Sequence, residues 1–124
     1  MQEMRLYEYA VIRIVPRIER EEFVNVGLIM MCKRHKWLRV ELLPDTDRLR
    51  AISGKTDTAP MLKQLDVFKV VSGGAGAFAD MPVEERFRWL TAVKSTCVQT
   101  SRPHPGRTAD LEATFTRLLE ELVK

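Results

Sequence analysis

The chain has few of the residues that build disulfide scaffolds, metal centres or membrane spans. Only two of its 124 residues are cysteines, Cys32 and Cys97, and they lie far apart in apolar, strand-like stretches. The two histidines, His35 and His104, add none of the closely spaced ligand pairs typical of structural zinc sites. No apolar run approaches the ~20 residues of a membrane-spanning helix. We therefore expect buried thiols, no metal or other cofactor, and no transmembrane segment.

A targeting signal is also missing. The first residues have neither the basic start nor the apolar stretch and small-residue cleavage site of a secretory signal, which predicts a cytoplasmic protein. A composition of 45% hydrophobic and 30% charged residues is typical of a globular chain. Because 124 residues leave no room for a second independent core, we expect a single domain over residues 1–124.

Charge of one sign is not in large excess, since the formal net charge is only +3. Such a balance favours solubility more than nucleic-acid binding. The basic residues are nevertheless clustered in two segments without carboxylates, residues 23–40 and residues 86–109. They are Lys33, Arg34, Lys36 and Arg39 in the first segment, and Arg86, Arg88, Lys94, Arg102 and Arg107 in the second.

Three strands are predicted in the first third of the chain. Residues 5–15 are rich in aromatic and β-branched types, and their alternation places Arg13 among apolar neighbours, so Arg13 needs a partner. Residues 23–32 resume a strand whose apolar run is interrupted by Asn25 and Gly27, and a glycine there indicates a bulge or a close backbone approach. A polar turn joins it to residues 37–43, where alternation directs Leu38, Val40 and Leu42 to the core and Trp37, Arg39 and Glu41 to solvent or a partner.

The remaining chain predicts mainly helices. We expect a short helix over residues 45–52, a second from about Pro60 with residues 67–71 either helix or strand, a loop over 72–80, and a third helix capped by Asp80. A fourth strand over residues 94–101, a rigid loop over 102–107 and an amphipathic helix over 109–123 capped by Thr108 follow. This order predicts an α+β fold: an antiparallel sheet of about four strands with helices mainly on one face.

No catalytic motif is supported by its context. Residues 74–79 match the G-x-G-x-x-A pattern of dinucleotide-binding proteins, but Pro82 interrupts the required helix and no βαβ repeat surrounds it, which favours a flexible loop. No lysine follows the glycines, so a phosphate-binding P-loop is excluded. Cys97 lacks the local signature of a nucleophile and reads as a packed thiol, and Ser95 and Ser101 show no such signature either.

The basic segment 86–107 is the best lead to a binding site. An arginine-bearing helix, a Lys-Ser-Thr stretch and an Arg-Pro-His-Pro-Gly loop would bind one anionic group if they converge. The alternative is that Arg88 pairs with Glu84 or Glu85, Trp89 packs, and the loop arginines are solvated. The tip at residues 33–36 has the same two readings: a solvated turn, or a nucleic-acid contact beside Trp37.

Three separated stretches carry a resemblance to a known family. They are Tyr-Ala-Val-Ile-Arg at 9–13, Glu-Phe-Val-Asn-Val-Gly at 22–27, and Arg-Phe-Arg-Trp-Leu at 86–90 followed by Lys-Ser-Thr at 94–96. In this order they resemble the bacterial family "domain of unknown function 3037" over nearly the whole chain. That family carries no established activity. Some members are encoded beside a HipA-like kinase, so the resemblance implies an accessory role and makes such a kinase the candidate partner.

The resemblance and the basic segment together define the candidate binding residues. They are Arg13, Asn25, Arg86, Arg88, Trp89, Lys94, Ser95, Thr96, Arg102 and His104. Several also have structural explanations, since Gly27 of the same motif suits a bulge, Trp89 a core position, and Arg13 a buried pair with Glu22 and Asn25. Our leading hypothesis is a non-catalytic protein-interaction module. An anion or nucleic-acid binder using residues 86–107 is the alternative, and a hydrolase or transferase without a recognisable motif is the third.

Overall fold

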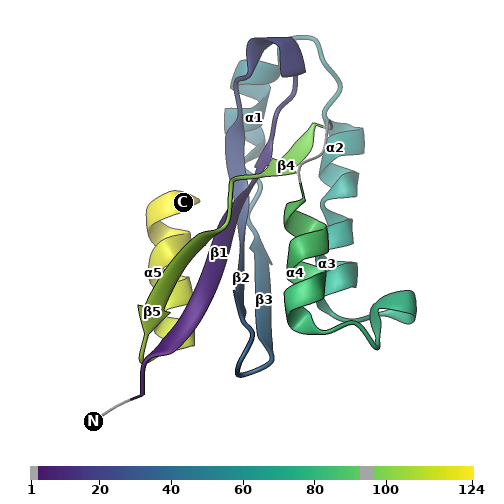
Figure 1. Ribbon diagram of the computed structural model, residues 1–124. Helices are drawn as coiled ribbons and strands as arrows, with labels where there is room; N and C mark the ends of the chain where they lie inside the picture. Colours follow the sequence, from purple (N-terminus) through teal and green to yellow (C-terminus); the bar gives the residue numbers. More distant parts are fainter. Residues whose placement is uncertain (1–2, 93–96) are drawn as a thin grey trace.

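The computed structural model describes residues 3–92 and 97–124, and it shows an antiparallel sheet with helices on both faces (Figure 1). The strands are β1 (Arg5–Ile14), β2 (Val24–Cys32), β3 (Trp37–Leu42), β4 (Val98–Thr100) and β5 (His104–Thr108). The helices are α1 (Thr46–Ser53), α2 (Ala59–Gln64), α3 (Asp66–Ser72), α4 (Val83–Thr91) and α5 (Leu111–Leu122), with short 3-10 turns at Ile18–Arg20 and Gly76–Phe78. The predicted α+β class is confirmed, with five strands instead of about four.

β1 is the central strand, and it is paired along most of both edges. The sheet order is β3-β2-β1-β4, and β5 also pairs with β1. One edge of β1 carries β2, while its other edge carries β5 opposite residues 5–9 and β4 opposite residues 12–14. The predicted loop over 102–107 is therefore wrong from residue 104 onward, because this Pro- and Gly-containing segment pairs with the open edge of β1 as an edge strand.

Gly106 shows how closely that edge strand approaches. It lies opposite Tyr7 in the ladder, and a Cβ atom at Gly106 would lie 2.3 Å from the Tyr7 hydroxyl oxygen. The Tyr7 ring therefore occupies the space that any other residue at position 106 would need. The glycine that suggested a loop is what permits the strand.

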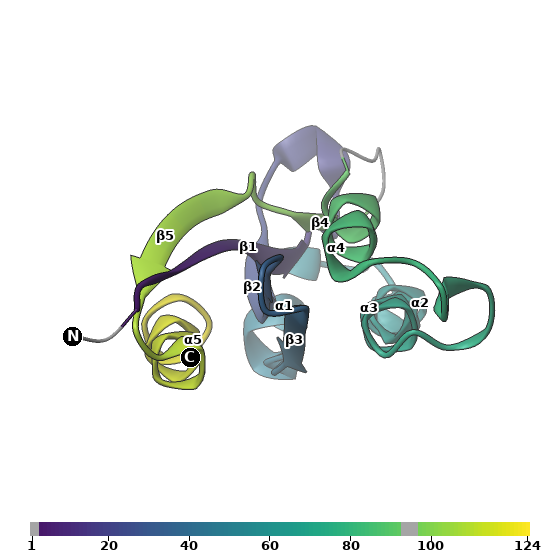
Figure 2. The same ribbon diagram turned by 60° about the horizontal axis from the view of Figure 1, so that its bottom comes forward.

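Two hydrophobic layers sandwich the sheet. Ala10, Ile12 and Ile14 of β1 pack with buried residues of α1, α2, α3 and α4, whereas Tyr7 and Val11 pack with α5. Figure 2 shows α5 separated from α3 and α4 by β2 and β3. Helices lie mainly on one face, as predicted, and α5 is the helix that covers the other face.

A β-bulge in β2 changes which side chains of this strand face each layer. The register shifts from Ile12 opposite Gly27 to Arg13 opposite Asn25, which leaves Val26 as the extra residue. Before the bulge the even-numbered Val24 and Val26 face the α1–α4 layer, and after it the odd-numbered Ile29 and Met31 do. A Cβ atom at Gly27 would lie 2.7 Å from the Glu41 carbonyl oxygen, so Gly27 supplies both the bulge and the close approach expected from the sequence.

Several element boundaries differ from the sequence prediction. Residues 67–71 are helical and belong to α3. α4 is preceded by Pro82 as its N-cap instead of Asp80, and Pro82, with a φ of −57° and a ψ of 153°, lies outside the helical conformation. α5 begins two residues later than predicted because β5 continues to Thr108, and the Asp110 side chain accepts the cap hydrogen bond from the Ala113 amide.

Replacing Gly27 by alanine tests the bulge. We expect Gly27→Ala to lower the free energy of unfolding by about 2–3 kcal/mol, because a backbone oxygen cannot move aside as a flexible side chain does. Gly54→Ala measures backbone strain without a steric contact: Gly54 has a φ of 60° and a ψ of −124°, which side chains rarely adopt, but no atom lies within 4 Å of an added Cβ, so a loss of about 1–3 kcal/mol is expected from strain alone. Urea denaturation measures both variants, and a loss below ~0.5 kcal/mol for Gly27→Ala would contradict the steric role of Gly27.

Candidate functional site

Arg13 and Asn25 lie side by side at the bulge, on the α5 face of the sheet. Arg13 lies between Ile12 and Ile14, which both face the α1–α4 layer, so its side chain points to the opposite face. There the Asn25 Nδ2 donates a hydrogen bond of 3.0 Å to the Leu122 carbonyl oxygen at the end of α5. The Arg13 guanidinium lies 4.4 Å from the centre of the Phe23 ring. The bulge thus brings two of the predicted residues together.

The expected pairing of Arg13 with Glu22 is not what the structure contains. Glu22 forms an ion pair with Arg20 on the exposed turn before β2. Hydrogen bonding to Arg20 holds the pKa of the Glu22 carboxyl below its ordinary value. Arg13 instead uses the Phe23 ring as a cation–π partner.

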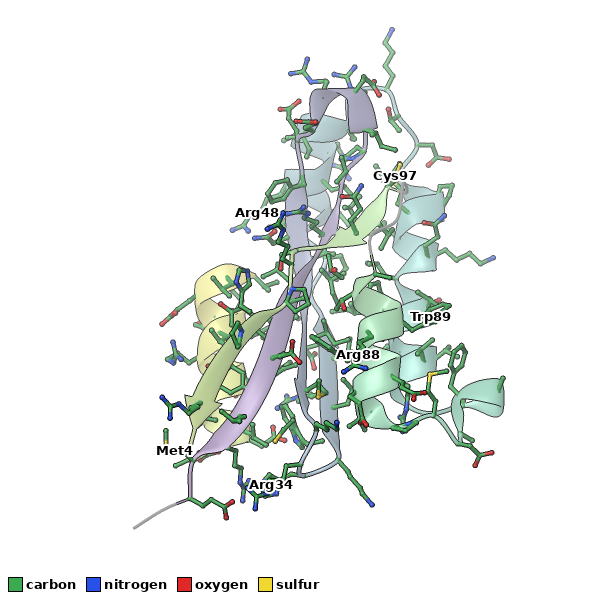
Figure 3. The ribbon with its side chains drawn as sticks, in the orientation of Figure 1. Met4, Arg34, Arg48, Arg88, Trp89 and Cys97 are labelled. Atoms are coloured by element: carbon green, nitrogen blue, oxygen red, sulfur yellow. The ribbon has the colours of Figure 1, made fainter. Side chains whose placement is uncertain are left out.

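The three predicted residues of α4 do not form one site. The Arg86 Nε donates to the Met81 carbonyl oxygen at 2.8 Å, and its Nη1 donates to the Ser72 carbonyl oxygen at 2.9 Å. Trp89 packs edge-on against Phe78, with ring centroids 5.5 Å apart. Arg88 is exposed and points to a different side of α4 from Trp89 (Figure 3). Arg86 therefore holds the loop before α4 and has a structural role.

Of the predicted loop residues, His104 lies on the α5 face. His104 begins β5 and stacks against Tyr9 with ring centroids 5.2 Å apart, and the Tyr9 side chain packs on the α5 layer. Arg102 is exposed in the connection between β4 and β5. α4 packs on the opposite face, so the structure separates Arg86 and Arg88 from His104 and Arg13. Lys94, Ser95 and Thr96 lie outside the described residues.

A different basic surface is built at the N-terminal end of β1, beside the turn that joins β2 to β3. We call it the hairpin patch and define it by Met4, Arg5, Leu6, Lys33, Arg34 and His35, which line a hollow of about 510 Å³. The Met4 residue is 53% exposed and the Leu6 residue is 69% exposed. Figure 3 shows Met4 and Arg34 at the same end of the molecule. Two large apolar side chains therefore lie open to solvent among three cationic side chains and a histidine.

The hairpin patch continues along the sheet. Leu6 and Lys33 also line a second hollow of about 220 Å³, whose other walls include Met31 and Pro105. Leu6 and Ala10 share a face of β1, but α4 and α3 lie beside its C-terminal half and leave the Leu6 end uncovered (Figure 1). The Lys33–Lys36 turn alone read as a solvated tip. Sequence alternation places Leu6 on the same face of β1 as Ala10. It does not show where the helices that cover this face stop, and that decides whether Leu6 is exposed.

The described residues contain neither a cluster of metal-ligating side chains nor a membrane-spanning helix. In the described part of the chain, no three His, Cys, Asp or Glu side chains lie close enough to hold a metal ion. None of the described helices is long and apolar enough to cross a membrane.

Measuring the stability of alanine variants distinguishes the structural role of Arg86 from the exposed position of Arg88. Arg86→Ala leaves the Ser72 and Met81 carbonyl oxygens without their donors and is expected to cost about 1–3 kcal/mol of unfolding free energy. Arg88→Ala, two residues away on the exposed side of the same helix, is expected to change it by less than ~0.5 kcal/mol. Urea denaturation measures the unfolding free energy of both variants. If Arg86→Ala leaves it unchanged, the structural role of Arg86 is wrong and Arg86 is again a candidate binding residue.

Comparison with known proteins identifies a family. The model of the family described as "Protein of unknown function (DUF3037)" matches residues 9–123, nearly the whole chain. No curated protein matches, and no solved structure matches.

Proposed function

Because the chain belongs to the DUF3037 family, whose description names no activity, we propose its function from its geometry: a non-catalytic module that binds an acidic, amphipathic segment of a protein partner on the hairpin patch. The observation that carries the proposal is the 69% exposed Leu6 residue beside the basic turn.

The chemistry of the patch selects the partner. Exposed apolar groups rimmed by charge are typical of protein-binding surfaces, where an apolar anchor supplies affinity and the rim supplies orientation. Arg5, Lys33 and Arg34 surround Met4 and Leu6, so a complementary segment presents apolar side chains flanked by Asp or Glu. Arg34 also lies 3.5 Å from Glu3, but both side chains are largely exposed, so this ion pair contributes little and is readily exchanged.

The contacts of Trp37 indicate which class of partner the basic turn binds. A basic tip that binds single-stranded nucleic acid uses nearby aromatic rings for base stacking. The Trp37 ring instead packs edge-on against Phe115 of α5, with centroids 6.2 Å apart, and its Nε1 donates a hydrogen bond to Glu112. Arg39 is held by the same carboxylate. This engagement with α5 supports a protein partner over a nucleic-acid contact at the 33–36 tip.

A pull-down with matched charge variants tests the proposal. The tagged protein is incubated with native lysate at low salt, with and without nuclease, and compared with Lys33→Glu/Arg34→Glu and Leu6→Thr. We expect a stoichiometric, nuclease-resistant partner whose affinity falls at least ~10-fold in both variants, equivalent to about 1.4 kcal/mol. Mass spectrometry identifies the partner, with the HipA-like kinase expected from the family resemblance among the proteins to look for.

The control variant is Arg88→Glu/Arg102→Glu, which changes the same number of exposed arginine or lysine charges away from the patch. It is expected to retain the partner. Retention by the hairpin-patch variants would place the interface elsewhere. Recovery of nucleic acid, with binding abolished by nuclease and by rising salt, would favour the anion-binding alternative.

A further inference from the structure

Figure 1 shows that β1 continues past the C-terminal end of α5. On the α5 face of this end of β1, Arg13 and Phe23 line a third hollow. It measures about 340 Å³ and is lined by Arg13, Val15, Ile18, Glu21, Phe23 and Gln99. This volume is at the lower end of the ~300–1,000 Å³ of small-molecule sites. We call it the Arg13 hollow.

Arg13 is the chemical centre of this hollow. Its Nε is buried and, among the described residues, has no hydrogen-bond partner. The Nε of Arg17 shares this condition but is not part of the lining. A buried donor without an acceptor costs about 1–3 kcal/mol, so hydrogen bonding within the protein does not explain why Arg13 is held at this position.

The guanidinium is also held in a defined orientation. Its carbon lies 4.4 Å from the centre of the Phe23 ring, which restricts the plane in which the nitrogen atoms lie. Because its Nε is buried, Arg13 presents its two terminal Nη groups, which are not among the buried unpaired atoms, as a planar fork. That fork matches the two oxygens of a carboxylate.

The walls supply apolar contact and a second charge. Ile18 and Phe23 are 48% and 47% exposed, while Val15 is buried. Gln99 of β4 lies directly opposite Arg13 in the ladder, so an amide side chain borders the guanidinium. Glu21 adds a carboxylate to the lining and disfavours ligands that carry several negative charges, such as phosphate esters.

We infer that the Arg13 hollow binds a small monocarboxylate that carries an apolar group. The Arg13 fork holds the carboxylate, and the apolar group lies against Ile18 and Phe23. A free amino acid with an apolar side chain and the C-terminal residue of a peptide share this chemistry. Glu21 favours the former, because its carboxylate attracts the ammonium group that a peptide-bound residue lacks.

NMR titration of the ¹⁵N-labelled protein tests this inference through the Nε–H signal of Arg13. The probes are 3-phenylpropionate, phenylalanine, N-acetylphenylalanine and phenethylamine, the last having the apolar group without the carboxylate. The three carboxylates are expected to shift the Arg13 signal saturably, with dissociation constants on the order of 1 mM. Phenethylamine is expected not to. A response to phenylalanine stronger than to N-acetylphenylalanine indicates the free amino acid, and the reverse order indicates a peptide C-terminus.

Variants assign the contacts. Ile18→Ser is expected to weaken 3-phenylpropionate binding several-fold while Arg13 stays in place, and Arg13→Gln to abolish it. Arg20→Gln is the matched control, since Arg20 lies on the same turn, pairs with Glu22 and does not line the hollow. Lys33→Glu/Arg34→Glu binds the probes normally if the two sites are independent.

The titration of the wild-type protein tests carboxylate binding even if the Arg13→Gln variant does not fold. No saturable shift of the Arg13 signal with any carboxylate, or an equal shift with phenethylamine, overturns the inference. Neither result affects the proposed docking on the hairpin patch, which lies at the other end of β1.

Discussion

The bulge at Val26 and Gly27 of β2 is the constraint on which the rest of the structure depends. An unbroken alternation would direct Val24, Val26 and then Leu28 to one face, but Leu28 packs with α5 while Val24 and Val26 pack with the α1–α4 layer. The extra residue reverses the alternation of side chains within β2. As a result, the apolar side chains on both faces of this strand are covered by a helical layer. Gly27 makes this possible because the Glu41 carbonyl oxygen occupies the space of a side chain.

The same bulge fixes the end of α5 and the surroundings of Arg13. It places Asn25 opposite Arg13 on the α5 face, where the Asn25 amide holds the Leu122 carbonyl oxygen. Arg48 of α1 donates to the next carbonyl oxygen, that of Val123, at 3.4 Å. Two of the carbonyls that a helix end leaves unpaired are thus satisfied by side chains, which fixes where α5 stops on the sheet. The Arg13 hollow lies just beyond that point.

β1 separates the two proposed binding surfaces. Its ten residues span roughly 30 Å, with the hairpin patch at the Arg5 end and the Arg13 hollow at the Ile14 end. Each surface exists because a helical layer covers only part of its face: α1–α4 leave Leu6 uncovered on one side, and α5 leaves Arg13 and Phe23 uncovered on the other. Binding to one surface is therefore compatible with binding to the other.

Sequence by itself determined the elements whose side chains repeat with a clear period: the strands of β1 to β3, the face of α5 and the glycine at the bulge. These follow from local sterics and from alternation between water and core. Tertiary structure alone decided that residues 104–108 form a strand, because their pairing depends on the open edge of β1 and not on their own Pro- and Gly-rich composition. It also decided that Arg86 serves two backbone carbonyls while Arg13 lines a hollow, since the hydrogen-bond acceptors within reach of an arginine are set by the packing of distant segments.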